Sequence, residues 1–198
     1  MKFDSVVLAG GQSRRMGQDK GLMAYTPTEA DSPAEASKPM GVWVANALAG
    51  CENLWVNANE QQQAYESLGY SVIPDVFHED IGFLAGPLLG ILTGLQHAKS
   101  DWVLFSPCDT PNIPENYAEK MAMFARDNLS YANVVFDGQR RQNLHLFLHK
   151  SLSEDLLLYL LSGGRKTYQW LDRVNAKEVD FSDQQAAFKN FNAPEDID

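Results

Sequence analysis

Short apolar segments of strand length alternate with longer segments of helical periodicity along the chain. We predict strands at residues 5–9, 54–58, 71–73, 102–106, 133–136 and 144–148, with a weaker candidate at 178–181. Helical patterns lie at residues 39–50, 60–67, 87–98, 114–126, 151–161 and 165–173. This order predicts an α/β fold with a mostly parallel sheet and helices on both faces. Residues 5–9 and 102–106 lack polar alternation, as expected of central strands that are buried on both sides.

Turn and helix-end signals refine this pattern. The Asp137-Gly138 pair separates two strand-like segments and predicts a hairpin, so we expect an antiparallel excursion in the sheet. Pro87 suits the first turn of a helix, where its missing N–H costs nothing. Ser151 and Glu154 have the spacing of a capping box for a leucine-rich helix, which Gly163-Gly164 then ends.

One segment has neither the strand nor the helix pattern. Residues 26–38 are rich in alanine, proline, serine and acidic side chains, and we expect them to form a mobile surface loop. No internal repeat or linker divides the rest of the chain. We therefore expect residues 1–198 to form a single domain.

Composition narrows the classes of protein to consider. Hydrophobic residues make up 44% of the chain, which is enough for a sizeable core. The formal charge of -10 argues against nucleic acid or an anionic membrane as partner, because both attract a basic surface. The longest uncharged apolar stretch, residues 81–95, is shorter than the roughly 20 residues that span a bilayer. Cys51 and Cys108 form no disulfide framework, and the first residues lack a signal-peptide pattern, so we expect a cytoplasmic protein.

The first predicted strand leads directly into a glycine-rich loop with a local excess of positive charge. Its glycine pair, serine and basic side chains are Gly10, Gly11, Ser13, Arg14, Arg15 and Lys20. Glycines let the backbone approach a ligand, and successive amide N–H groups can line a concave anion site. We interpret the loop as a polyphosphate cradle, in which the amides and Ser13 hold phosphates that Lys20 or the arginines neutralise. The alternative is a tight turn beside a solvated basic patch.

Two common nucleotide-binding motifs do not match this loop. No Gly-Lys-Ser/Thr opens a helix, so the loop is not of the Walker type. The glycines also lack the G-x-G-x-x-G spacing of dinucleotide-binding folds. Ordinary P-loop ATPases and NAD-dependent enzymes are therefore excluded.

Polar side chains follow three other predicted strands. Asp109 comes after strand 102–106 and is expected at the same edge of the sheet as the glycine-rich loop. A carboxylate beside a bound triphosphate is a natural Mg²⁺ ligand, although Asp109 could instead cap a turn. Asn57 and Asp75 end two further strands, and their oxygens could read the N1–H and N2–H₂ donors of guanine. Both are also ordinary turn formers.

Other catalytic patterns are missing from the sequence. The four histidines form no ligand cluster, and no Ser-His-Asp order or close pair of carboxylates stands out. Cys108 has no histidine nearby in sequence to activate it and is expected to be a small buried residue. These observations favour phosphoryl transfer without a protein nucleophile.

Taken together, these segments resemble the molybdenum cofactor guanylyltransferases, the MobA-type proteins of bacteria. The matching segments run through most of the chain: Leu8-Ala9-Gly10-Gly11 with Ser13, Arg15-Met16-Gly17, Asp19-Lys20-Gly21-Leu22, Asn57-Ala58-Asn59, Asp75, Gly86-Pro87-Leu88, Pro107-Cys108-Asp109-Thr110-Pro111, Val179-Asp180-Phe181-Ser182-Asp183 and Asn190-Phe191-Asn192-Ala193-Pro194-Glu195. The resemblance implies a three-layer, Rossmann-like nucleotidyltransferase fold. It also implies transfer of GMP from GTP to the phosphate of molybdenum-molybdopterin, with release of pyrophosphate.

The resemblance assigns roles to matching positions. Those that would bind GTP are Leu8, Ala9, Gly10, Lys20, Asn57, Asp75 and Asp109, with Gly11 and Ser13 added from the cradle. Asp109 would also hold Mg²⁺, and Arg15, Lys20 and Asp109 would be the catalytic residues. We expect a monomer with transient contacts to cofactor-delivery proteins or apo-molybdoenzymes. Two alternatives stay open, a relative that uses CTP or a sugar phosphate and a nucleotide-binding module without turnover. The Gly10-Gly11 pair favours guanine, since those relatives usually have alanine at the first of these positions.

Overall fold

A computed structural model of the chain describes residues 1–10, 19–26, 37–76, 78–81 and 86–191. Its centre is a seven-stranded sheet in the order β5-β4-β1-β6-β8-β7-β9. The strands are β1 (Asp4–Leu8), β4 (Leu54–Asn57), β5 (Ser71–Ile73), β6 (Trp102–Pro107), β7 (Ala132–Phe136), β8 (Arg141–His149) and β9 (Lys177–Asp180). All seven were predicted from the hydrophobic pattern, and their positions are confirmed.

Strand direction follows the prediction of a mostly parallel sheet. β1 pairs in parallel with β4 and β6, and β4 with β5. β8 is antiparallel to both β6 and β7, and β9 is again parallel to β7. Of the described strands in this sheet, β8 alone therefore runs against the others. The hairpin predicted at Asp137-Gly138 joins β7 to β8, and Gly138 has the positive φ of 91° that such a turn favours.

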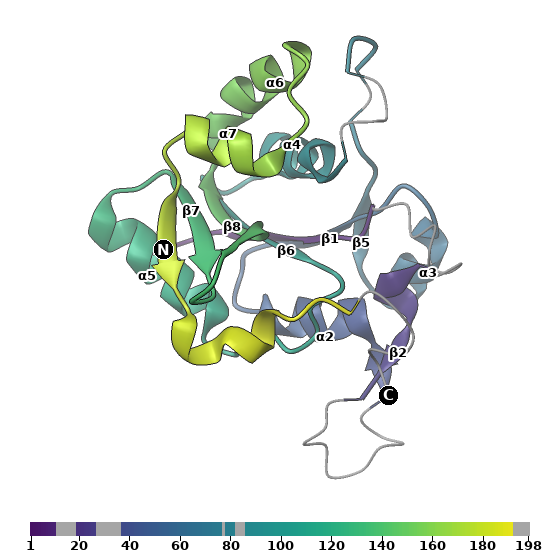
Figure 1. Ribbon diagram of the computed structural model, residues 1–198. Coiled ribbons are helices and arrows are strands. Elements are labelled where there is room, and N and C mark those ends of the chain that lie inside the picture. Colours follow the sequence, from purple (N-terminus) through teal and green to yellow (C-terminus); the bar gives the residue numbers. More distant parts are fainter. Residues whose placement is uncertain (11–18, 27–36, 77, 82–85, 192–198) are drawn as a thin grey trace.

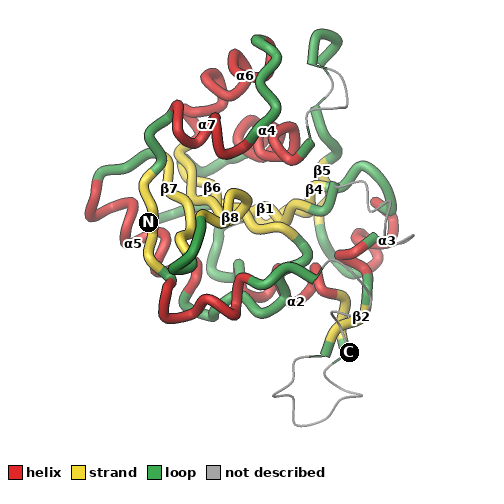
Figure 2. Tube along the Cα trace, in the orientation of Figure 1, coloured by secondary structure: helices red, strands yellow, loops and turns green. Residues whose placement is uncertain are grey.

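Helices cover both faces of the sheet (Figures 1 and 2). One layer holds α4 (Pro87–His97), α6 (Ser153–Leu161) and α7 (Thr167–Arg173). The other holds α2 (Met40–Ala47) and α5 (Tyr117–Asn128), with α3 (Gln62–Ser67) and the 3₁₀ segment η4 (Ser182–Phe188) packed into the same core. Val6 packs toward the α4 layer and its neighbour Val7 toward the α2 layer. This alternation explains why β1 is apolar at successive positions.

A small antiparallel sheet of β2 (Ala24–Tyr25) and β3 (Lys38–Pro39) closes the segment that was expected to be a loop. Lys38 lies in β3, so the expected loop ends earlier than predicted. Residues 27–36 lie outside the described residues. Within the part of the chain that the structure describes, no helix is long and apolar enough to cross a membrane.

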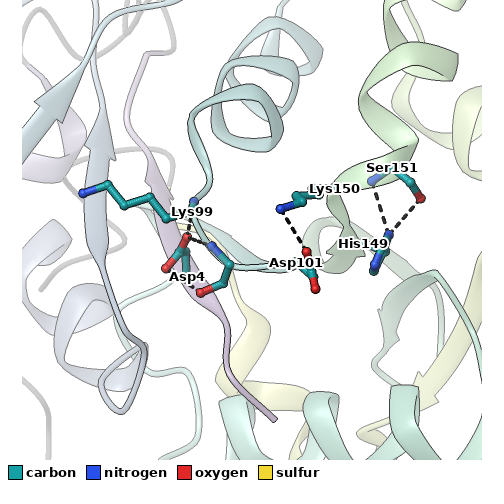
Figure 3. A network of polar contacts seen from close by, with 7 residues as sticks. Asp4, Lys99, Asp101, His149, Lys150 and Ser151 are labelled. Atoms are coloured by element: carbon teal, nitrogen blue, oxygen red, sulfur yellow. Dashed lines mark hydrogen bonds and ion pairs between the residues drawn. The ribbon is translucent and has the colours of Figure 1, made fainter.

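The capping box predicted at Ser151 and Glu154 is wrong. Ser151 lies in the short 3₁₀ segment η3 (Lys150–Leu152), and its Oγ lies 2.8 Å from His149 Nδ1. The Ser151 backbone N–H also donates to that nitrogen (Figure 3). His149 therefore caps η3, and the helix α6 starts two residues after Ser151, at Ser153. The predictions for Pro87 and for Gly163, which has a φ of 89° just after α6, are confirmed.

Candidate active site

The carboxyl ends of β1, β4 and β6 lie side by side because these strands are parallel neighbours. The Ala9 N–H donates to the Asn57 carbonyl over 2.8 Å, and the Cys108 N–H donates to the Leu8 carbonyl over 3.1 Å. These bonds continue the sheet register one step past the strand ends. The start of the glycine-rich loop, Asn57 and the segment that carries Asp109 therefore meet at one edge, where ligands bind in open parallel sheets.

Lys20 and Asp109 lie in contact at this edge although they are far apart in the sequence. The Lys20 Nζ is 3.1 Å from Asp109 Oδ2, and their side chains are only 19% and 14% exposed. Lys20 begins the 3₁₀ turn η1 (Lys20–Leu22), which follows the glycine-rich loop, and Asp109 follows β6. The structure thus places the two residues, predicted separately from the sequence, in one ion pair.

The two carboxylate oxygens of Asp109 differ in their contacts, since only Oδ2 lies against Lys20. Asp109 Oδ1 is buried and has no hydrogen-bond partner among the described residues. The main-chain carbonyl of Asp109 accepts a 2.9 Å hydrogen bond from the Phe191 N–H. The hydroxyl of the next residue, Thr110, donates to the Pro107 carbonyl. The loop is held by these backbone contacts, while one carboxylate oxygen faces no described donor. A buried anionic oxygen in this position suits a hard cation.

The turn that carries Lys20 is held by Asp19 and Tyr65, to which the sequence analysis gave no role. Asp19 Oδ1 accepts the Gly21 N–H at 2.9 Å, which caps η1. The same oxygen accepts the hydroxyl of Tyr65, from α3, at 2.7 Å. Burial raises the pKa of Asp19, and it also raises the pKa of the Tyr65 hydroxyl, which therefore remains a donor. An aspartate directly before a Lys-Gly turn is the signal that could have identified this cap.

Gly21 and Cys108 fill the space behind this turn. A Cβ added to Gly21 would lie 2.3 Å from the Tyr65 hydroxyl oxygen and 3.1 Å from Cys108 Cβ. Position 21 therefore has no room for a larger residue. Cys108 is buried, as predicted, and burial raises the pKa of its thiol. A protonated thiol is a poor nucleophile, so Cys108 is a packing residue in this site.

A cluster of amide and carboxylate groups lies at the ends of β4 and β5. Asn57 Nδ2 donates to Asp75 Oδ1 over 2.9 Å and to the Ile73 carbonyl over 3.1 Å. Asn59 Nδ2 donates to Asp75 Oδ2 over 2.7 Å, and the Asp75 N–H donates back to Asn59 Oδ1. The structure therefore brings Asn57 and Asp75 together and adds Asn59, which the sequence analysis had not placed in the site.

Two glycines border Asn57. A Cβ at Gly90, on α4, would lie 2.2 Å from Asn57 Oδ1, and one at Gly10 would lie 3.3 Å from the same atom. The helix α4 can approach this amide so closely because Gly90 lacks a side chain, whereas a Cβ at Gly10 would only be a tight contact. Gly10 is thus the described member of the glycine pair that adjoins the Asn57 and Asp75 cluster.

The remaining predicted residues divide into two groups. Leu8 and Ala9 are each only 7% exposed and pack in the core, so their side chains are not available to a nucleotide. Any contact that they make with a ligand would come from the backbone. Gly11, Ser13 and Arg15 lie outside the described residues.

The histidines form no cluster in the described part of the chain. His145 is buried, lies 3.2 Å from Ser106 Oγ through Nδ1, and packs edge-on against the rings of Tyr117 and Phe188. Burial lowers the pKa of His145 to about 3, so its ring is neutral at pH 7. It is therefore a packing residue.

Comparison with known proteins gives consistent matches along most of the chain. Residues 5–177 match the family described as MobA-like NTP transferase domain. The molybdenum cofactor guanylyltransferase of Serratia proteamaculans is 35% identical over 197 residues, covering 98% of this chain and 92% of that protein. The molybdenum cofactor guanylyltransferase of Yersinia pseudotuberculosis is 36% identical over 196 residues, with the same coverage. The structure of molybdopterin-guanine dinucleotide biosynthesis protein A from Archaeoglobus fulgidus is similar with a TM-score of 0.71 at 18% identity, covering 98% of this chain and 94% of that one.

Proposed function

The chain belongs to the MobA-like NTP transferase family, and we propose that it transfers GMP from GTP to the phosphate of molybdenum-molybdopterin. The products are pyrophosphate and the molybdopterin guanine dinucleotide cofactor. The observation that carries this proposal is the Lys20–Asp109 pair, which joins a cation and a carboxylate at the carboxyl ends of β1 and β6.

The reaction needs alignment and charge neutralisation more than it needs a base. A phosphate monoester has a second pKa of about 6, so the acceptor is already an anion at pH 7. The main obstacle is repulsion between this anion and the triphosphate, together with charge that builds on the leaving pyrophosphate. Lys20 supplies a positive charge held by a capped turn. We propose that backbone amides of the glycine-rich loop add N–H donors to the phosphates. Arg15 is proposed to offset the negative charge of the phosphates together with Lys20.

Asp109 fits the role of a Mg²⁺ ligand. Its Oδ2 is held by Lys20, while its buried Oδ1 has no donor among the described residues. The described residues contain no cluster of three or more His, Cys, Asp or Glu side chains that could hold a metal. Mg²⁺ commonly takes one or two carboxylates and completes its shell with water and phosphate, so the proposed site needs no such cluster. When bound, the ion would offset phosphate charge.

The cluster at the ends of β4 and β5 is proposed to read the base. Guanine presents N1–H and N2–H₂ donors, and the two oxygens of the Asp75 carboxylate match them in number and charge. Asn57 orients one of these oxygens. Cytosine lacks this pair of donors, which favours GTP over CTP as the substrate.

The remaining assignments concern partners and location. We propose a monomer that meets GTP and molybdenum-molybdopterin, with transient contacts to delivery proteins or apo-molybdoenzymes. The net charge of -10 does not suit binding to nucleic acid or to an anionic membrane. Both cysteines are free, which fits the reducing cytoplasm.

Turnover measurements on two variants test the proposal. Lys20→Ala and Asp109→Ala are expected to fold and to lose about 10³-fold in GMP transfer, because the first removes a positive charge that offsets phosphate charge and the second removes the proposed Mg²⁺ ligand. Circular dichroism checks the fold, and release of pyrophosphate from GTP with molybdenum-molybdopterin measures turnover. Near-normal transfer by either variant would show that its assigned role is wrong.

A thermal-shift panel separates the alternatives. GTP, CTP, UTP and ATP are compared with Mg²⁺ present, and a ligand at 100 times its Kd adds about 2.7 kcal/mol of stability. A preference for CTP would contradict the assignment of guanine. GTP binding without any transfer to molybdenum-molybdopterin would favour the non-catalytic module.

A further inference from the structure

Asp75 is held from two sides by side chains of the segment that ends β4. Asn59 makes a reciprocal pair of bonds with it, since Asn59 Nδ2 donates to Asp75 Oδ2 at 2.7 Å and the Asp75 N–H donates to Asn59 Oδ1 at 2.9 Å. Asn57 Nδ2 holds the other carboxylate oxygen at 2.9 Å. Asn57 is almost fully buried, whereas Asn59 is exposed.

An exposed asparagine is seldom needed for the core, so its two bonds require another explanation. The bonds span 16 residues of sequence and connect the end of β4 to the end of β5. Of the common side chains, asparagine offers a donor and an acceptor at the right reach for this pairing. An aspartate at position 59 would place a second carboxylate against Asp75, and an alanine would leave Asp75 Oδ2 to water.

The geometry points to Asn59 as a positioning residue that sets the choice of guanine by fixing the carboxylate of Asp75. This inference rests on the proposed function, in which Asp75 reads the base. A carboxylate has about four lone-pair sites, and the two asparagines occupy two of them. One site on each oxygen remains for the two donors of a guanine edge. Holding the group in advance makes the guanine contact selective, because an analogue that lacks a donor then leaves a fixed oxygen unpaired.

The test compares nucleotides that differ at the guanine edge. ITP lacks the exocyclic amino group of GTP, so the ratio of kcat/KM for GTP to kcat/KM for ITP reports the contact to that group. We expect this ratio to fall at least tenfold in Asn59→Ala, because Asp75 Oδ2 is no longer held. Asn59→Asp should lower the ratio as much or more, since it keeps the acceptor for the Asp75 N–H and removes the donor.

A matched control lies at the other end of β4, next to the start of β1. Asn53 Nδ2 donates to Asp4 Oδ1 at 2.8 Å, and Asp4 also accepts from the Lys99 and Ser100 N–H groups (Figure 3). Asn53→Ala therefore removes a comparable amide–carboxylate bond away from the nucleotide. It is expected to leave the GTP/ITP ratio within twofold of wild type, even if the protein becomes less stable.

The possible results are distinguishable. A tenfold loss of selectivity in Asn59→Ala, with the ratio kept in Asn53→Ala, supports the inference. A wild type that prefers GTP and an Asn59→Ala variant that keeps this preference would overturn the inference alone. A wild type that does not prefer GTP would overturn the proposed function and the inference with it. Should Asn59→Ala fold poorly, Asn59→Ser gives the same comparison.

Discussion

The contact between Tyr65 and Asp19 is expected to stabilise both the fold and the position of Lys20. Tyr65→Phe removes one oxygen atom and keeps a ring of nearly the same size in a site where Tyr65 is 1% exposed. The lost bond is the 2.7 Å donation to Asp19 Oδ1. Asp19 retains its bond from the Gly21 N–H, so the cap of η1 is weakened and not abolished.

The size of the effect follows from the kind of bond that is lost. A hydrogen bond to a charged group contributes about 1.5–3 kcal/mol, and the cavity left by one hydroxyl is small. We therefore expect Tyr65→Phe to lower the free energy of unfolding by about 2 kcal/mol. Turnover should also fall, by about tenfold, because the turn that carries Lys20 is less firmly held.

Urea unfolding measures the first effect, and a double-mutant cycle with Asp19→Ala isolates the contact. The coupling free energy should be about 1.5–3 kcal/mol. Tyr70→Phe is the matched control, because the Tyr70 hydroxyl makes no hydrogen bond among the described residues. A coupling below about 0.5 kcal/mol, or equal losses in Tyr65→Phe and Tyr70→Phe, would refute the reasoning.

Two other features give separate predictions. Burial lowers the pKa of His145 from 6.5 to about 3, so the unfolded chain binds the proton first as the pH falls. The neutral, buried His145 ring therefore contributes its full stability to the fold above pH 6.5, and this contribution is lost as the pH falls toward 3. Because of His145, the free energy of unfolding of wild type should fall by about 2 kcal/mol between pH 7 and pH 5, and His145→Gln should lack this fall in urea unfolding. The same dependence of unfolding free energy on pH in both proteins would contradict the assignment. In Gly90→Ala the new Cβ would lie 2.2 Å from Asn57 Oδ1, which displaces an amide that holds Asp75. The affinity for GTP, measured by calorimetry, should fall about tenfold. The higher helix propensity of alanine offsets about 1 kcal/mol of the stability that the clash costs. Unchanged affinity would show that Asn57 does not orient the site.

The fold could be predicted well because its signals are local. Val6 and Val7 face opposite layers, and a strand buried on both sides reads as a continuous apolar run. The turn at Gly138 and the helix start at Pro87 follow from backbone preferences of single residues. The predicted capping box at Ser151 is wrong because the Ser151 backbone N–H donates to the ring of the neighbouring His149. The spacing of serine and glutamate alone does not reveal this competing contact.

Residue types in the candidate site could also be named in advance, including Lys20, Asp109, Asn57 and Asp75. Their individual contacts could not, because each contact joins segments that are far apart in the sequence. Tyr65 reaches Asp19 across 46 residues, and Lys20 reaches Asp109 across 89. Such contacts depend on strand order and register, which place β1 between β4 and β6. Periodicity along the chain determined the helices and strands, and the residue types at their ends determined the available chemistry. The tertiary structure decided which of these polar groups meet, because the parallel sheet brings distant strand ends to a common edge.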